Sequence, residues 1–196
     1  MQQESGVAVR FIRVEDHAGW LRLYRGYREF YGMPHDPAVY DTVWDWLMDA
    51  AREERGLIAD RDGDAVGLAH FRSFARPIVG ASGMFLDDLF TDAAVRGSGV
   101  ATAMLTRIAM IARDEGATVV RWITAEDNLV AQNLYDRVAD RTSWITYDLL
   151  PAHGFQAMDL TRSREEEDDP APSPASWCRN ANREAFDALP SADPEL

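Results

Sequence analysis

Residues 84–105 read M-F-L-D-D-L-F-T-D-A-A-V-R-G-S-G-V-A-T-A-M-L and contain two kinds of periodicity. Residues 84–90 are mostly apolar, which is typical of a buried strand, and are interrupted by Asp87 and Asp88. From Val100 onward the apolar residues recur at helical spacing, and Gly116 is placed to end the helix. The sequence therefore predicts a strand, a glycine-containing loop and a helix in direct succession.

A loop of this kind is suited to binding phosphate. The first N–H groups of a helix have no intrahelical acceptor, and the helix dipole favours an anion there. Gly97 and Gly99 let the backbone come close to a ligand, and Arg96 adds a charged donor. We interpret Ser98 as a contributor of backbone groups. The P-loop pattern is absent because the chain contains no Gly-Lys pair. The dinucleotide pattern G-x-G-x-x-G is absent because G-S-G is followed by V-A-T.

Two motifs carry a family resemblance. The pattern R-x-x-G-x-A at residues 96–101 resembles the pyrophosphate loop of the GNAT superfamily of acyl-CoA N-acyltransferases. The pattern N-x-x-A-x-x-L-Y at residues 128–135 resembles the second signature of that family, in the family's order and spacing. The resemblance implies an α/β fold with a mixed, partly splayed sheet flanked by helices. The strands at residues 84–90 and 118–123 would run parallel and then separate.

The resemblance also implies acetyl-CoA as the acyl-donor co-substrate. Its pantetheine arm would lie between the separated strands and pair with the free backbone groups of the first strand. Its pyrophosphate would lie against the glycine loop. The residues whose main chains are implied to contact it are Leu89, Phe90, Thr91, Arg96, Gly97, Ser98, Gly99, Val100, Ala101, Thr102, Asn128 and Ala131.

Tyr135 is the predicted catalytic side chain. Attack of an amine on the thioester releases a CoA thiolate, and a phenol within hydrogen-bond reach can protonate it. A free tyrosine has a pKa of about 10, so it carries its proton at neutral pH. The alternative is that Tyr135 only packs beside Leu134 on a helix; its register with the second signature favours the acid role.

Carboxylates follow both parallel strands and predict an acceptor site. Asp87 and Asp88 interrupt the first strand, and Glu126 and Asp127 follow the second. Open α/β sheets bind ligands at the carboxyl ends of their strands, and an amine with a pKa of about 10 needs a base. Neighbours on a strand face opposite ways, so the sequence leaves open whether Asp87 or Asp88 enters the site. Asp127 is also placed to cap a helix.

Two aromatic-rich helices are predicted before the sheet is complete. The first carries large aromatic residues at helical spacing, and the second begins at Asp36, followed by Pro37 at the first helical position. Such stripes are usually core. The resemblance implies that both helices also line the acceptor site. One or two of Tyr24, Tyr27, Tyr31 and Trp44 would then face the substrate, with Tyr27 taken as a substrate-binding residue; Trp20 shares the first stripe.

The acceptor is predicted to be a primary amine of a small cationic molecule: a polyamine, a diamino acid or an amine-containing antibiotic. The branch of the family that this chain most resembles is that of the diamine and polyamine acetyltransferases, on the segments L-D-D-L-F (residues 86–90) and A-E-D-N (residues 125–128). Two departures are the absence of a proline between Thr91 and Arg96, and residues 136–144 where many members have Gly-Phe. The alternatives are acetylation of a protein N-terminus or lysine, and a non-catalytic CoA-binding module.

Composition bounds the remaining possibilities. The chain has 196 residues, a net charge of −13 and a sequence pI near 4.6, which argues against binding to nucleic acid or anionic membranes. Its one cysteine, Cys178, indicates a reducing compartment. We predict a cytoplasmic protein without a signal peptide or membrane span, and no metal site because the histidines lack ligand spacing. The resemblance is compatible with a homodimer.

The remaining segments give the predicted domain organisation. Residues 1–161 are predicted to form the GNAT domain, and residues 162–196 an acidic, proline-rich linker and tail. Apolar residues near helical spacing at residues 177–189 leave two alternatives for the tail, a short docked helix or an undocked, frayed end. Asp62–Gly63 is a hairpin signal. Residues 76–83 are predicted to form a loop, and strands are predicted at residues 7–13, 57–60, 65–74, 142–150 and 154–160.

Overall fold

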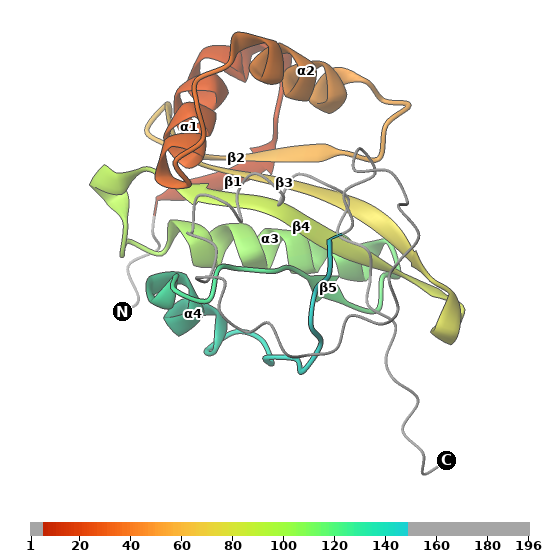
Figure 1. Cartoon of the computed structure of the whole chain (residues 1–196). Helices are drawn as coiled ribbons and strands as arrows, with labels where there is room; N and C mark the ends of the chain where they lie inside the picture. Colours follow the sequence, from red (N-terminus) through yellow and green to blue (C-terminus); the bar gives the residue numbers. More distant parts are fainter. Residues whose placement is uncertain (1–5, 149–196) are drawn as a thin grey trace, which may run out of the picture. The chain divides into compact units, whose positions relative to one another are not determined.

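A mixed sheet of five strands organises the fold, and a computed structural model describes residues 6–148. The strands lie in the order β1 (Val7–Phe11), β2 (Arg55–Arg61), β3 (Asp64–Arg76), β4 (Ala81–Thr91) and β5 (Val120–Arg121). The first four are antiparallel to their neighbours, and β5 runs parallel to β4 (Figure 1). The parallel arrangement of β4 and β5 was predicted from the sequence and is confirmed.

The chain divides into two compact units. The first comprises Met1–Phe30 and Pro34–Thr124, and the second Tyr31–Met33 and Ala125–Leu196. The sheet belongs to the first unit, and the helix α4 (Leu129–Tyr135) to the second. The predicted tail, its helix and the strand at residues 154–160 lie outside the described residues.

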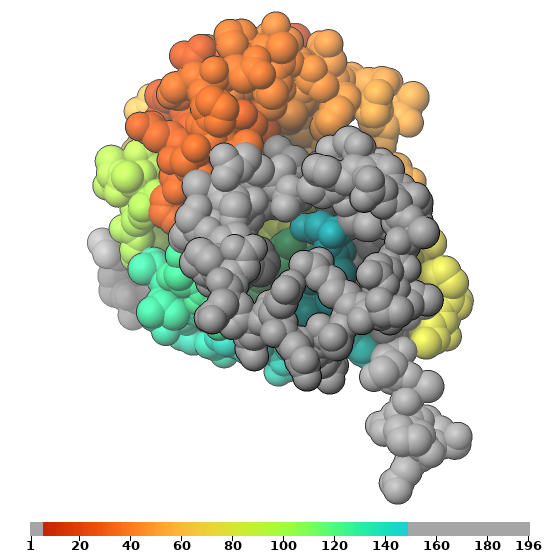
Figure 2. Space-filling view, in the orientation of Figure 1, coloured from red at the N-terminus to blue at the C-terminus, as the bar shows by residue number. Residues whose placement is uncertain are grey.

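Three helices cover the two faces of the sheet. The helices α1 (His17–Phe30) and α2 (Pro37–Met48) lie over one face, and α3 (Val100–Asp114) lies over the other (Figure 1). In the space-filling view, α1 and α2 form a continuous outer layer, coloured orange (Figure 2). Short 3₁₀ turns occur at Val14–Asp16, Pro77–Val79 and Ala93–Val95. Among residues 6–148, no helix is long and apolar enough to cross a membrane.

Local sequence signals explain most of these elements. The Asp36 carboxylate accepts a hydrogen bond from the Ala38 N–H (3.0 Å), which satisfies one of the free donors at the start of α2. The hairpin between β2 and β3 turns at Asp62 (φ 56°) and Gly63 (φ 91°), as the Asp-Gly signal predicted. Gly116, with φ 72°, follows the end of α3.

Two aromatic-rich helices and the sheet share a core. Trp20, Leu23 and Tyr24 of α1 and Tyr40 of α2 pack with Ile58 of β2 and Leu68 of β3, and all six are buried. Half-buried aromatic side chains, including Tyr27 and Trp44, border this cluster. The aromatic stripes are therefore mainly core, as large apolar side chains usually are.

Two predictions from the sequence are wrong, one of a strand and one of the length of a loop. Residues 142–148 form no regular secondary structure, and three of the apolar side chains that predicted a strand there are exposed: Trp144, Ile145 and Tyr147. Strand propensity needs a paired neighbour to take effect, and no described strand pairs with this segment. The predicted loop at residues 76–83 is shorter, because β4 begins at Ala81. Gly83 lies within that strand, and a glycine fits there because a Cβ would meet the Phe74 ring at 2.6 Å.

Gly67 of β3 allows α3 to lie close to the sheet, and this gives a stability prediction. A Cβ at this position would meet Val100 Cγ1 at 2.8 Å and the Phe90 carbonyl at 3.1 Å. Gly67→Ala is expected to lower the free energy of unfolding by about 1–3 kcal/mol, the usual effect of overpacking. Urea denaturation would measure it. Gly6→Ala, which places a methyl group in open space, is the control; equal effects of both changes would contradict this packing.

Candidate active site

The second half of β4 has one free edge. β4 pairs with β3 along its length, but with β5 only at Met84 and Phe85. Among the described residues, no strand pairs with residues 86–91 on the β5 side. The backbone donors and acceptors along this edge, including those of Leu89, can therefore pair with an extended ligand.

The loop that follows β4 gives α3 a start that is suited to binding an anion. Gly97 and Gly99 adopt left-handed conformations (φ 78° and 87°), and nothing lies within 4 Å of where a Cβ would stand on either residue. Gly99 is the N-cap of α3 and makes no side-chain capping bond. The first N–H groups of the helix, at residues 100–102, have no intrahelical acceptor and lie at the positive end of the helix dipole.

Side chains beside this loop differ from the expectation in two respects. The Arg96 Nε donates to the Thr91 carbonyl (3.3 Å), and the guanidinium lies over the rings of Phe30 and Phe90. A second cation, Arg61, was not predicted; its Nη2 donates to the Ser98 hydroxyl (2.8 Å). The strand-end position of Arg61 gave no sequence signal for this contact. Both cations add to the positive potential of the loop.

A β-bulge places both aspartates of β4 on one face of the sheet. Asp88 pairs with His70 and Leu86 pairs with Phe71, so Asp87 is the extra residue of the bulge. The Asp88 carboxylate accepts from His70 Nδ1 (2.8 Å), and the Asp87 carboxylate accepts from Arg72 Nε (3.3 Å). The sequence predicted that only one of the two would enter the site, because regular strands alternate.

A buried chain of hydrogen bonds fixes the orientation of Asp88. The Trp20 indole N–H donates to His70 Nε2 (2.9 Å), and His70 Nδ1 lies 2.8 Å from Asp88 Oδ2. An indole can only donate, so Nε2 must be the acceptor and Nδ1 must carry the proton. The side chains of His70 and Asp88 are 2% and 12% exposed. Trp20 and His70 therefore set the imidazole tautomer and hold one oxygen of Asp88.

Two further carboxyl groups have raised pKa values. Burial, reinforced by the charge of Asp87, raises the pKa of Glu54 to about 7. Burial also raises the pKa of Asp87 to about 6, against the lowering effect of Arg72, although the Asp87 side chain keeps about 30% exposure. Groups that titrate near neutral pH can exchange protons with a substrate. Glu54 precedes β2, where the sequence gave no signal for it.

The second unit carries the other motif. The Asn128 carboxamide oxygen accepts from the Ala131 N–H (3.3 Å) and so caps α4, a role that the sequence had considered for Asp127. Tyr135 ends this helix and is half-buried; burial, with a smaller effect of Tyr31, raises its pKa to about 12. Because of this raised pKa, the phenol of Tyr135 keeps its proton at neutral pH. The side chain of Glu126 is exposed, and its backbone carbonyl accepts a hydrogen bond from Gln132 Nε2 (2.8 Å).

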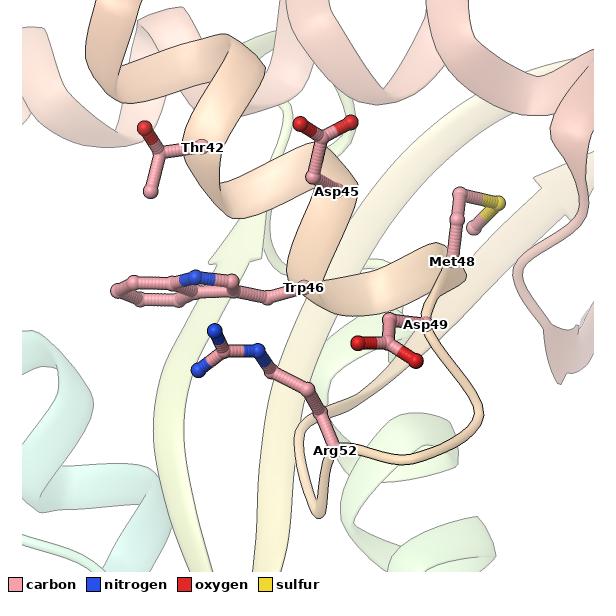
Figure 3. Close-up of a pocket in the computed structure, with 6 residues that line it drawn as sticks. All are labelled: Thr42, Asp45, Trp46, Met48, Asp49 and Arg52. Atoms are coloured by element: carbon pink, nitrogen blue, oxygen red, sulfur yellow. The ribbon is translucent and has the colours of Figure 1, made fainter.

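A groove of about 460 Å³ lies elsewhere in the first unit, along α2 and the segment after it. The Arg52 guanidinium lies over the Trp46 ring, 5.5 Å from its centroid (Figure 3). The other lining residues are Thr42, Asp45, Met48 and Asp49. None of the residues predicted from the sequence lines this groove, and it does not belong to the site at β4. Among residues 6–148, no three His, Cys, Asp or Glu side chains are arranged to hold a metal ion.

Comparison with known proteins agrees with this geometry. The model of the acetyltransferase (GNAT) family matches residues 20–139, more than half of the chain. The chain belongs to the GNAT acetyltransferase family. It is 27% identical over 143 residues to the D-amino-acid N-acetyltransferase HPA3 of Saccharomyces cerevisiae, covering 72% of this chain and 89% of that one.

Solved structures show the same fold. The ribosomal-protein-alanine N-acetyltransferase from Brucella melitensis biovar Abortus 2308 matches with a TM-score of 0.63 and 20% identity, over 74% of this chain and 98% of that one. AAC(6')-Iy in complex with the bisubstrate analog CoA-S-monomethyl-acetylneamine matches with a TM-score of 0.61 and 17% identity, over 74% and 97%. At these identities the likeness concerns the fold.

This chain is an N-acetyltransferase that uses acetyl-CoA as its acyl donor. Two parts of the chain, the start of α3 and the edge of β4, are suited to that co-substrate. The left-handed glycines leave the start of α3 open for a pyrophosphate, and the free edge of β4 can pair with an extended arm.

The raised pKa of Glu54 predicts a pH effect on stability. The folded state holds the Glu54 proton up to about pH 7, whereas a free glutamate releases it near the ordinary value of 4.5. The stabilisation from this proton is therefore complete below about pH 4.5 and is lost as the pH rises through 7. Glu54→Gln is expected to flatten the decline in unfolding free energy between pH 5 and 8, measured by urea denaturation. Glu53→Gln makes the same change at the exposed neighbour; an equal flattening would attribute the effect to net charge.

The hydrogen bond between Trp20 and His70 gives a second stability prediction. Trp20→Phe removes the indole N–H and leaves His70 Nε2 buried without a donor. The free energy of unfolding is expected to fall by about 1–3 kcal/mol more than in a matched variant. That control is Trp44→Phe in the same aromatic cluster, since no hydrogen bond of the described residues involves the Trp44 indole. Equal losses in the two variants would show that the bond contributes nothing.

Proposed function

We propose that this enzyme acetylates the primary amine of a small acceptor by direct attack on acetyl-CoA, with Tyr135 as the general acid. The observation that carries the acceptor class is the pair of carboxylates at the β4 bulge, Asp87 and Asp88, beside Glu54. A cationic amine is attracted to such a group. The candidate acceptors are polyamines, diamino acids and amine-containing antibiotics, and the name of the yeast relative adds free amino acids.

The proposed reaction transfers one acetyl group from sulfur to nitrogen and includes three proton transfers. The ammonium of the acceptor binds at Asp88, whose orientation is fixed by His70, and gives a proton to Asp87, either directly or through water. The neutral nitrogen attacks the thioester carbonyl carbon, the C–S bond breaks and a C–N bond forms. The leaving thiolate takes the phenolic proton of Tyr135. As the tetrahedral intermediate collapses, the nitrogen gives its second proton through water to the Tyr135 phenolate, which restores the phenol, and Asp87 later releases the first proton to solvent.

Acetyl-CoA would be held as the family resemblance implies. Main-chain groups of Leu89, Phe90 and Thr91 would pair with the pantetheine arm, and those of residues 96–102 with the pyrophosphate. The free edge of β4 and the open start of α3 support this assignment. The backbone at Asn128 and Ala131 would complete the co-substrate site. Glu126 and Tyr27 remain proposed acceptor contacts; the Tyr27 ring packs against Phe90, at 6.2 Å between centroids.

Two alternatives remain to be tested. One is acetylation of a protein N-terminus or lysine, which requires an acceptor groove open to a chain. The other is a CoA-binding module without turnover. Thiol release from acetyl-CoA, measured across polyamines, amino acids, aminoglycosides and peptides, separates them. The diamine branch, the homodimer and the cytoplasmic location also stay predictions.

Tyr135→Phe tests the general acid. The variant keeps the ring and removes the phenolic proton, so kcat is expected to fall ~10²-fold or more at saturating acetyl-CoA. The control is Tyr147→Phe, which removes an exposed phenol from the same unit. An unchanged kcat in Tyr135→Phe, with normal thermal unfolding, would remove Tyr135 from the mechanism.

A further inference from the structure

Arg28 is a buried cation with an incomplete set of partners. It lies in the last turn of α1 and is 5% exposed. One Nη2 hydrogen bond reaches the Pro34 carbonyl (3.0 Å), and the guanidinium lies over the Tyr40 ring, 5.8 Å from its centroid. The Arg28 Nε is buried and has no hydrogen-bond partner. No carboxylate of the described residues forms an ion pair with it.

This arrangement indicates an anion that the chain itself does not supply. A guanidinium stays protonated, and its burial is costly unless a counter-charge or a full set of acceptors compensates it. The chain has 33 acidic residues against 20 Lys and Arg, so acids are not scarce. More exposed arginines, such as Arg10 and Arg55, do pair with carboxylates. The guanidinium fork of Arg28 is therefore suited to a planar carboxylate from a ligand.

Tyr24 lies near both Arg28 and the acceptor carboxylate Asp88. It is one helical turn before Arg28, on the same face of α1. Its ring packs edge-on against those of Tyr40 (6.0 Å between centroids) and His70 (5.4 Å), and His70 binds Asp88. Burial raises the pKa of the Tyr24 phenol to about 12; the charge of Asp88 raises it further, and Arg28 lowers it through its charge and through a side-chain hydrogen bond to the phenol. One neutral phenol is thus close to an anion and to a cation.

We propose that Arg28 binds the carboxylate of a free amino acid whose amino group is held at Asp88, so that the acceptor of this enzyme is an amino acid. This inference rests on the proposed function, because it assigns a second contact to the same acceptor. A zwitterion matches the two opposite charges near Tyr24. Polyamines and aminoglycosides carry additional cations and no carboxylate, and Arg28 would repel them.

The experiment compares each amino acid, in both enantiomers, with its primary amide, which keeps the amine and removes the carboxylate charge. Wild-type kcat/KM is expected to be at least about tenfold higher for the preferred acid than for its amide. Arg28→Met should lower kcat/KM for the acid by roughly 10- to 100-fold, mainly through KM, and leave the amide within about threefold. The control is Arg25→Met, which removes an exposed arginine over the same Tyr40 ring (5.4 Å) and should change neither.

Each other outcome is decisive. Equal losses for acid and amide in Arg28→Met would make Arg28 a structural residue and overturn the proposal. Wild-type turnover of polyamines or aminoglycosides without turnover of amino acids would overturn it and leave the acetyltransferase function intact. No turnover of any amine would instead remove the proposed function. Should Arg28→Met fail to fold by thermal unfolding, the wild-type ratio of acid to amide decides the question.

Discussion

The structure depends on one constraint, which is that within residues 6–148 the strand β4 has a strand partner on both sides only as far as Phe85. Beyond that residue, β3 continues to pair with β4, but β5 does not. Unpaired backbone groups need a partner, and a strand-like ligand can supply it. Because the start of α3 follows directly from the same strand, one continuous segment presents both a pairing edge and an anion-binding helix terminus.

The same strand also organises the charges. Its bulge turns Asp87 toward Arg72 while Asp88 binds His70, so two adjacent carboxylates share a face that a regular strand would divide between them. Trp20 of α1 donates a hydrogen bond to His70 and so holds the imidazole that binds Asp88. α1 also carries Arg28, near Tyr24. The helix that closes the hydrophobic core therefore also places the polar groups around the acceptor carboxylates.

Much of the fold could be predicted, because its signals are local. A mostly apolar run predicted β4 and helical spacing predicted α3, while Asp36 and Pro37 predicted the start of α2 and Asp62–Gly63 predicted the hairpin. The signal failed at residues 142–148, where apolar alternation occurs without a paired strand. The second half of the predicted strand at residues 118–123 is likewise unpaired, since β5 ends at Arg121.

By itself, the sequence determined the order of the elements, the glycine loop and the family, because each follows from residues that are close in the chain. Only the tertiary structure decided which polar side chains meet. Trp20 and His70 are 50 residues apart and His70 and Asp88 are 18 apart, so their contacts depend on strand register and on how α1 packs. The burial of Arg28 and Glu54 depends on the same packing, and no local pattern encodes it.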